Sequence, residues 1–306
     1  MSIMYALIPA VLWGAMGIVN GWAGGRVANQ ILGGALGSLV FSIVVGVYAL
    51  FEGPTWPVVF SMAGLTYVLS GIAWAAGTSF QLAAFKKMGV SQASGLNTAG
   101  QIAVNALVGA AVFGEWQGAH QWTIGLLAIV SVIIGVFLIS GKPSHLNKDG
   151  VRLTIISVFA YMIYFMIPKT VALLHLVHVD TGTLHNTMAL SLPIAIGQTI
   201  GALIFGIFIF NGGNFKLPLL TKETAKNGLA GIMWGTGEVM IRLAVLNPAV
   251  GQAKASTLSQ MGIIVSTLGA ILILKERKTK TQIIGIAIGA PLRYVGRYSS
   301  NACWLN

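Results

Sequence analysis

One acidic residue lies deep inside an apolar stretch of this 306-residue chain. Glu238 occupies the middle of the run 225–246, and Arg242 follows it by one helical turn. A charge in such surroundings is costly and indicates a function, unless the two side chains simply neutralise each other. Three roles stay open for the pair: a structural ion pair, a carrier of protons, or a contact to a substrate.

Neutral polar side chains form a second pattern, along one face of each of two other apolar runs. They are Ser94, Asn97, Gln101 and Asn105 in the run 88–112, and Gln252, Ser256 and Gln260 in the run 252–274. Their spacing places them on helical stripes, where they either hold helices together through hydrogen bonds or line a polar cavity. A cavity would suit a neutral polyhydroxyl ligand, because Asn and Gln both donate and accept hydrogen bonds.

Tryptophans add an aromatic component to these patterns. Trp13, Trp74 and Trp234 lie inside apolar runs, whereas tryptophan mostly marks the ends of membrane helices. An indole there either packs against neighbouring helices or covers the C–H face of a sugar ring while its N–H bonds a hydroxyl. Gln81 shares a helical face with Trp74, and Asn20 adds an amide to the first run, so both join the candidate ligand-binding residues.

The composition defines the class of protein. Hydrophobic residues make up 56% of the chain and charged residues 8%, and the mean hydropathy is +0.82, which indicates an integral membrane protein in contact with a lipid bilayer. The net charge of +11 does not indicate nucleic acid, because the basic residues lie in short connections rather than on one patch. The single cysteine, Cys303, provides neither a disulfide framework nor a thiolate metal site.

Ten apolar runs are long enough to form helices across a bilayer. They lie near 1–22, 31–51, 57–80, 88–112, 121–140, 152–173, 187–210, 225–246, 252–274 and 281–296. The sequence therefore predicts an all-α integral membrane fold, with a first five-helix repeat over 1–141, a linker over 142–151 and a second five-helix repeat over 152–306. The last run is atypical, because Pro291 and Arg293 follow about a dozen apolar residues, fewer than a span needs.

An internal duplication supports the two halves. Residues 70–93 align without gaps on 230–253, with Trp74 on Trp234 and Gly77 on Gly237. Five helices per half would give the two copies opposite orientations in the membrane. Most basic residues follow odd-numbered runs: Arg26, Lys86, Lys87, Lys142, Lys148, Arg152, Lys216, Lys222, Lys226, Lys275, Arg277, Lys278 and Lys280. By the positive-inside rule these connections are cytoplasmic and the N-terminus lies outside.

Two kinds of site are not predicted. His175, His178, His185 and Asp180 lie close together at irregular spacing, which favours a solvated loop over a metal site. The glycine-rich stretches lie inside apolar runs rather than after a strand, so nothing indicates a phosphate loop or an ATPase motor. We expect no cofactor, no metal and no enzymatic activity.

Several short motifs occur in order along the two halves. They are Trp13–Gly14, Gly24–Gly25 with Gln30, SxxNTxxQ at 94–101, FGEW at 113–116, Gln252, SxxxQMGIIxSTLG at 256–269 and LKERKT at 274–279. Together they resemble the glucose/ribose porter family of bacterial sugar uptake proteins, within the drug/metabolite transporter superfamily. The resemblance implies a ten-helix bundle in the cytoplasmic membrane of a bacterium that takes up a monosaccharide such as glucose or ribose, with protons as the coupling ion.

Two alternatives stay open at this stage. The same scaffold can export small metabolites or cationic drugs, but the first helix carries Asn20 and lacks the glutamate of the small multidrug exporters that such proteins resemble. A membrane receptor or scaffold that transports nothing would not need paired polar stripes inside the bundle. The sequence distinguishes neither glucose from ribose nor one oligomeric state from another.

Overall fold

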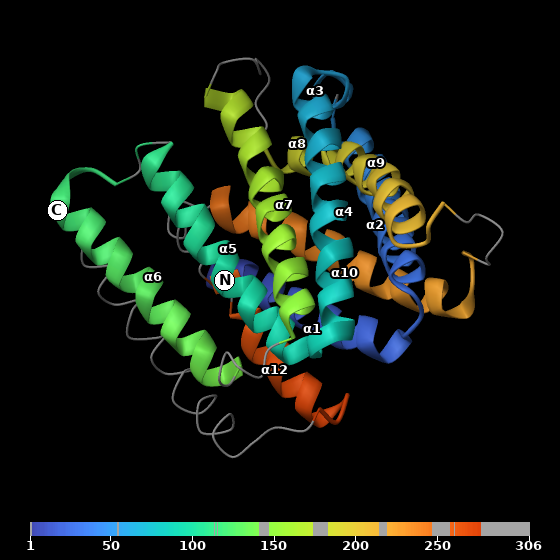
Figure 1. Cartoon of the computed structure of the whole chain (residues 1–306). Coiled ribbons are helices and arrows are strands. Elements are labelled where there is room, and N and C mark those ends of the chain that lie inside the picture. Colours follow the sequence, from blue (N-terminus) through green and yellow to red (C-terminus); the bar gives the residue numbers. More distant parts are fainter. Residues whose placement is uncertain are drawn as a thin grey trace.

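The computed structural model describes residues 2–53, 55–112, 114, 116–140, 147–173, 183–213, 219–246, 258, 259 and 261–276. Within these ranges the chain is almost entirely helical and contains no strand (Figure 1). The helices are α1 (Ser2–Ala23), α2 (Val27–Glu52), α3 (Trp56–Val59), α4 (Met62–Met88), α5 (Val90–Ala111), α6 (Gly118–Ser140), α7 (Lys148–Leu173), α8 (Leu184–Ala189), α9 (Ser191–Gly201), the π-helix η2 (Ala202–Ile209), α10 (Lys222–Leu246) and α12 (Gly262–Leu272).

Local chemistry explains where several helices begin and end. The Ser61 hydroxyl accepts a hydrogen bond from the Ala63 N–H at 3.1 Å and caps α4. Gly89 separates α4 from α5, and its φ of +81° is a conformation that favours glycine. The Thr183 hydroxyl caps α8 in the same way as Ser61 caps α4.

The predicted runs correspond to helices, with differences in detail. The run 57–80 is divided between α3 and α4, and α4 continues to Met88, so Lys86 and Lys87 lie in its last turn. The run 187–210 is divided at Leu190 between α8 and α9 and then widens into the π-helix η2. Helix α7 begins at Lys148, inside the predicted linker. The tenth run, 281–296, lies outside the described residues.

The described helices have the length and surface of membrane spans. Met4–Ala23, Val27–Glu52, Met62–Met88, Lys148–Ile167 and Leu184–Ile209 are each long and apolar enough to cross a bilayer. Large apolar side chains are exposed along α2, α4, α6, α7 and η2, for example Val44, Phe51, Leu127 and Phe159. Lipid rather than water is the solvent that such surfaces require, and the protein is therefore a multi-pass membrane protein.

The helices pack in reciprocal pairs. Helix α4 packs against α7 and α9, while α10 packs against α1 and α2; likewise α5 packs against α7, and α12 against α1. If α1, α2, α4 and α5 are matched in order with α7, α9, α10 and α12, each of these contacts in one half has its counterpart in the other. The contacts of the described helices are therefore symmetric between the two sets.

Glycines at the helix crossings follow the same correspondence. A Cβ atom at Gly71 of α4 would collide with the backbone oxygen of Ile194 on α9, and one at Gly231 of α10 would collide with that of Gly34 on α2. The members of both pairs are related by a shift of 160 residues, the same shift that aligns Trp74 with Trp234. Backbones in direct contact at these crossings leave no room for a side chain.

Connections after odd-numbered spans meet at one end of the bundle. The Lys86 ammonium donates to the Gly25 carbonyl, and the Asn227 amide donates to the Gly24 carbonyl at 3.2 Å. The Glu276 carboxylate, just beyond α12, accepts hydrogen bonds from the Val90 and Ser91 N–H groups at the start of α5, at 2.6 and 3.3 Å. The basic residues described in these connections therefore lie on the same side of the molecule.

Candidate functional site

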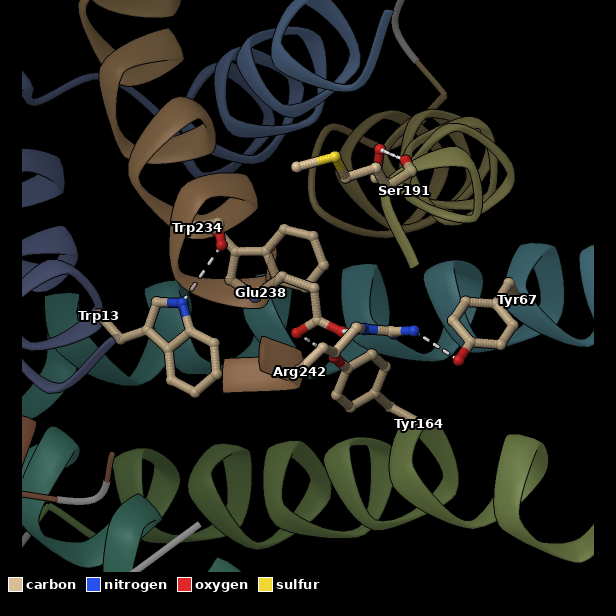
Figure 2. Close-up of polar contacts among 8 residues, drawn as sticks. Trp13, Tyr67, Tyr164, Ser191, Trp234, Glu238 and Arg242 are labelled. Carbon is tan, nitrogen blue, oxygen red and sulfur yellow. Dashed lines mark hydrogen bonds and ion pairs between the residues drawn. The ribbon is translucent and has the colours of Figure 1, made fainter. Parts of the chain in front are cut away.

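The centre of the bundle holds a buried ion pair on α10 (Figure 2). Arg242 donates from Nε and Nη2 to the same oxygen of Glu238, Oε1, at 3.0 and 2.6 Å. The side chains of Glu238 and Arg242 are only 7% and 21% exposed. The two residues lie one helical turn apart, as the sequence predicts. Removing one partner of such a buried pair lowers the free energy of unfolding by about 3–5 kcal/mol.

Two tyrosines from other helices complete the network around the pair. The Tyr164 hydroxyl of α7 donates to Glu238 Oε2 at 2.9 Å. Arg242 Nη1 donates to the Tyr67 hydroxyl of α4, and the guanidinium carbon lies 4.5 Å from the centre of the Tyr67 ring. The pair therefore connects three helices, α4, α7 and α10, through charge-assisted hydrogen bonds and a cation–π contact.

A tryptophan pair lies directly beside this network. The rings of Trp74 and Trp234 are 4.8 Å apart between centroids and tilted by 53°. The Trp234 ring also meets the Tyr164 ring at 6.5 Å, edge to face. Trp13 of α1 donates its indole N–H to the Trp234 carbonyl at 3.3 Å, as Figure 2 shows. Trp74 and Trp234 are 3% and 5% exposed, so their faces are closed to solvent in this conformation.

A second tyrosine of α7 bonds to α4. The Tyr161 hydroxyl donates to Gln81 Oε1 at 2.8 Å and lies 2.9 Å from the Thr78 hydroxyl. Tyr161 and Tyr164 are three residues apart and share one face of α7. One tyrosine thus contacts α4 and the other contacts the carboxylate of α10, so that α7 bridges the two helices that carry the tryptophans.

The predicted stripe on α5 forms hydrogen bonds between helices. Asn97 is 1% exposed and donates from Nδ2 to the Ser157 hydroxyl of α7 at 2.7 Å, while Gln101 donates to Asn97 Oδ1. Ser157 in turn donates to the Gly77 carbonyl of α4 at 2.7 Å. In this conformation the amide of Asn97 therefore connects α5, α7 and α4.

A hollow elsewhere in the described part of the protein is apolar, unlike the polar network around Glu238. It lies between α5, α6 and α7, has a volume of about 220 Å³ and an apolar lining that includes Leu96, Val104, Ile133, Val158 and Phe159. A polyhydroxyl ligand needs hydrogen-bonding partners, which this lining does not offer. Among the described residues, none of the predicted polar site residues lines this hollow.

The structure brings together some of the predicted site residues. Trp13, Trp74, Trp234, Glu238 and Arg242 form one contiguous group, to which Gln81 is adjacent through Tyr161. Asn20 lies two turns beyond Trp13, near the end of α1. Its main-chain carbonyl accepts a hydrogen bond from the side-chain amide of Gln30 at 2.8 Å. The remaining candidates Gln252, Ser256 and Gln260, and the loop residues His175, His178 and Asp180, lie outside the described residues.

Sequence reasoning missed the partners that α7 and α4 supply. Tyr67 does not share a regularly spaced helical face with the other site residues, so the sequence gives no signal for it. Ser157, Tyr161 and Tyr164 are spaced four and three residues apart, and this spacing, typical of one helical face, was the signal that could have identified them. Within the described ranges no group of three His, Cys, Asp or Glu residues could hold a metal ion.

Comparison with known proteins identifies the family. The sequence pattern described as "Sugar transport protein" matches residues 4–298, almost the whole chain. The chain belongs to this sugar transport family. The "Glucose uptake protein GlcU" of Bacillus subtilis is 33% identical over 300 residues and covers 94% of both chains, and the "Probable glucose uptake protein GlcU" of Priestia megaterium is 36% identical over 301 residues with the same coverage.

Solved structures support the fold. One crystal structure, 14% identical in sequence, superimposes with a TM-score of 0.57 over 97% of this chain and 98% of the other. At that identity the likeness concerns the fold alone. As a member of the sugar transport family with several apolar spanning helices, the protein is a multi-pass protein of the bacterial cytoplasmic membrane.

Proposed function

We propose that this sugar transporter takes up glucose, or ribose as a second candidate, together with protons. The observation that carries the proposal is the carboxylate of Glu238, buried in the centre of the bundle, whose partner Tyr164 also meets the ring of Trp234, which pairs with Trp74. A titratable group close to a sugar-stacking surface is what a coupled transporter needs. The names of the two GlcU relatives support glucose as the substrate.

The sugar site that we propose lies between α4 and α10. The indole faces of Trp74 and Trp234 would cover the apolar side of the sugar ring, and Gln81 would bond hydroxyls at its edge. Because the two rings are now in contact, the sugar must separate them, and α4 and α10 must move apart during transport. Further contacts are proposed for Trp13, Asn20, Asn97, Gln101, Gln252, Ser256 and Gln260.

The architecture that we propose is ten transmembrane helices in two inverted five-helix repeats. The reciprocal packing of α4 with α7 and α9, and of α10 with α1 and α2, supports it. Helices α5, α6 and α10, with 22, 23 and 25 residues, also have spanning length. The clustered basic connections support a cytoplasmic location for that end of the molecule and an external N-terminus.

Glu238 is the proton carrier in this proposal. Its carboxylate is the acidic group that the described chain places at the centre of the bundle, whereas Glu276 lies at an end, where protons exchange with bulk water. While Glu238 is ionised, the guanidinium of Arg242 would balance its charge, so that the empty site holds no unpaired buried negative charge before the proton and the sugar bind.

Uptake of labelled glucose and ribose by cells that lack their own systems for both sugars tests the substrate. We expect the wild-type protein to accumulate glucose above the external concentration. Glu238→Gln preserves size and hydrogen bonding but cannot titrate, so it should exchange internal for external sugar without accumulating it. Proton-dependent accumulation by the variant would contradict the role of Glu238, and no uptake of either sugar by the wild type would contradict the proposed substrates.

A further inference from the structure

The two oxygens of the Glu238 carboxylate have different partners. Oε1 accepts both hydrogen bonds from Arg242, at 3.0 and 2.6 Å. Oε2 accepts its hydrogen bond from the neutral Tyr164 hydroxyl, at 2.9 Å. Arginine stays charged and acts only as a donor, whereas a tyrosine hydroxyl can donate or accept.

This difference determines where a proton can bind. At Oε1 an added proton would face two donors of a permanent cation, and the ion pair would have to break. At Oε2 the tyrosine hydroxyl needs only to rotate, because its oxygen has lone pairs that can accept the new O–H. If Glu238 takes up a proton, Oε2 is therefore the oxygen that can bind it without breaking the ion pair.

Protonation changes what Tyr164 can offer to other groups. A hydroxyl carries one proton, and while Glu238 is ionised that proton is donated to Oε2. Once Oε2 carries a proton and donates it to the tyrosine oxygen, the tyrosine's own O–H is free to donate elsewhere. The tyrosine keeps its proton throughout, so one proton is gained in total, on Glu238.

The freed hydroxyl lies close to the proposed sugar surface. The Tyr164 ring meets the Trp234 ring at 6.5 Å, and Trp234 meets Trp74 at 4.8 Å. Both Tyr164 and Trp234 belong to the same buried cluster at the centre of the bundle. A sugar hydroxyl between the tryptophans would be a suitable acceptor for the tyrosine's proton.

In the part of the chain that the structure describes, few other titratable groups face the Glu238 carboxylate. Glu238 is faced by Arg242 of α10 and Tyr164 of α7, and Tyr67 of α4 lies behind Arg242. The other helices packed against α10 carry further titratable side chains, none of which bonds to Glu238 within the described ranges. These are Tyr5 on α1, Tyr48 and Glu52 on α2, and His185 on α8.

We propose that Tyr164 couples proton binding to sugar binding: a proton on Glu238 frees the Tyr164 hydroxyl to donate to the sugar. The inference rests on the proposed function, in which Glu238 carries the proton. Because coupling between two ligands is reciprocal, the sugar must also favour protonation of Glu238 by the same factor. Tyr164 is a positioning residue for the proton and a specificity residue for the sugar.

Tyr161 provides a matched control on the same helix. It lies one turn before Tyr164 and is equally buried, with 8% against 6% exposure. Its hydroxyl bonds to Gln81 and Thr78 and not to a carboxylate. Tyr161→Phe removes the same atom as Tyr164→Phe, so any difference in proton coupling between the variants reflects the contact to Glu238.

The test uses purified full-length protein in lipid nanodiscs, with D-glucose as the probe. Tryptophan fluorescence gives the Kd for glucose at several pH values, and a pH indicator in weak buffer reports protons taken up when glucose binds. For the wild type and Tyr161→Phe we expect affinity to rise as pH falls, by up to about tenfold per pH unit for one coupled proton, with proton uptake on binding. Tyr164→Phe should show less than about a twofold change per pH unit and no proton uptake.

Glu238→Gln separates this inference from the proposed function. If Glu238→Gln still takes up protons with glucose, Glu238 is not the carrier and the proposed function fails. If Glu238→Gln loses proton uptake but Tyr164→Phe retains it, the proposed function stands and the role of Tyr164 is overturned.

A second variant covers the case in which Tyr164→Phe alone does not fold. In Glu238→Gln the amide N–H₂ faces Tyr164 as a protonated carboxyl would, because the amide oxygen must stay toward Arg242. Adding Tyr164→Phe there removes the hydroxyl without leaving a charge unpaired on Oε2. We expect glucose binding to weaken about fivefold, the loss of one neutral hydrogen bond. Equal affinity of the single and double variants would overturn the proposal.

Discussion

Ser157 joins three helices, α4, α5 and α7, through hydrogen bonds. Its hydroxyl donates to the Gly77 carbonyl of α4 and accepts from the Asn97 amide of α5, both at 2.7 Å, and it is fully buried. The hydroxyl thus gives the buried Asn97 amide an acceptor and adds a second hydrogen bond to a helical carbonyl of α4.

Ser157→Ala should lower the free energy of unfolding by about 1–3 kcal/mol, because the buried Asn97 amide loses its acceptor. The thermal unfolding midpoint of detergent-purified protein measures the change. Ser131→Ala is the control: this serine donates to the Leu127 carbonyl within exposed α6, and its loss should leave the midpoint unchanged. Equal midpoints for both variants would show that the hydrogen bonds of Ser157 do not stabilise the fold.

At the residue scale, the sequence identifies the charged site residues more readily than the residues that bond to them. The isolated carboxylate and its arginine are evident in an apolar run, and the spacing of Trp74 and Trp234 within the duplication predicts their equivalence. Tyr67, Tyr161 and Tyr164 look like ordinary members of apolar or interfacial helices. Their role depends on which helices α4 and α7 contact, and this tertiary property cannot be read from local periodicity.

At the element scale, backbone contact sets how the central helices cross. The crossings of α4 with α9 and of α10 with α2 both depend on a glycine whose missing side chain lets a backbone oxygen approach. Gly34 lies at the second crossing, yet a Cβ atom added to it would meet nothing within 4 Å. The same substitution at neighbouring positions should therefore have opposite consequences.

Gly71→Ala and Gly231→Ala should each reduce the amount of folded protein in the membrane and lower the unfolding midpoint, because the new methyl group displaces a helix. Gly34→Ala should leave the midpoint unchanged or raise it, since alanine favours the helix by up to about 1 kcal/mol. Fluorescence-detected size-exclusion chromatography of membrane extracts measures all three. Normal folding of both Gly71→Ala and Gly231→Ala would contradict the close crossings.

The sequence predicts where helices lie more reliably than where they break. Spanning length and apolar composition predict α1, α2, α5, α6, α7 and α10 to within about four residues, whereas α4 begins five residues later and ends eight residues later than the run 57–80. The break at Leu190 and the widened turns of η2 do not follow from composition, because the run 187–210 contains no charged residue that would divide it. Packing against α2 and α4 rather than local propensity decides such features.

At the scale of the whole molecule, the connections after α1, α4 and α12 meet at one end and carry the basic residues described there. The sequence predicts this clustering from the basic residues that follow odd-numbered runs, although it does not show which connections are neighbours. The side of the membrane that each end faces follows from the positive-inside rule and stays a prediction.

Cysteine labelling tests this orientation. In a variant that lacks Cys303, a cysteine replacing Lys148 should resist a membrane-impermeant thiol reagent in intact cells, whereas one replacing Gln117 should react. Both positions are exposed, so protection reports the membrane and not burial. Permeabilised cells serve as the control, in which both should react. The reverse pattern in intact cells would invert the topology.

An imposed pH gradient shows whether the protein couples glucose uptake to protons. The purified protein is reconstituted into liposomes with no other energy source, and labelled glucose is added with the outside more acidic than the inside. We predict that glucose accumulates inside above the external concentration, that a proton ionophore abolishes the accumulation, and that Glu238→Gln only equilibrates the sugar. Equilibration of glucose by the wild-type protein with no response to the gradient would contradict proton-coupled sugar uptake.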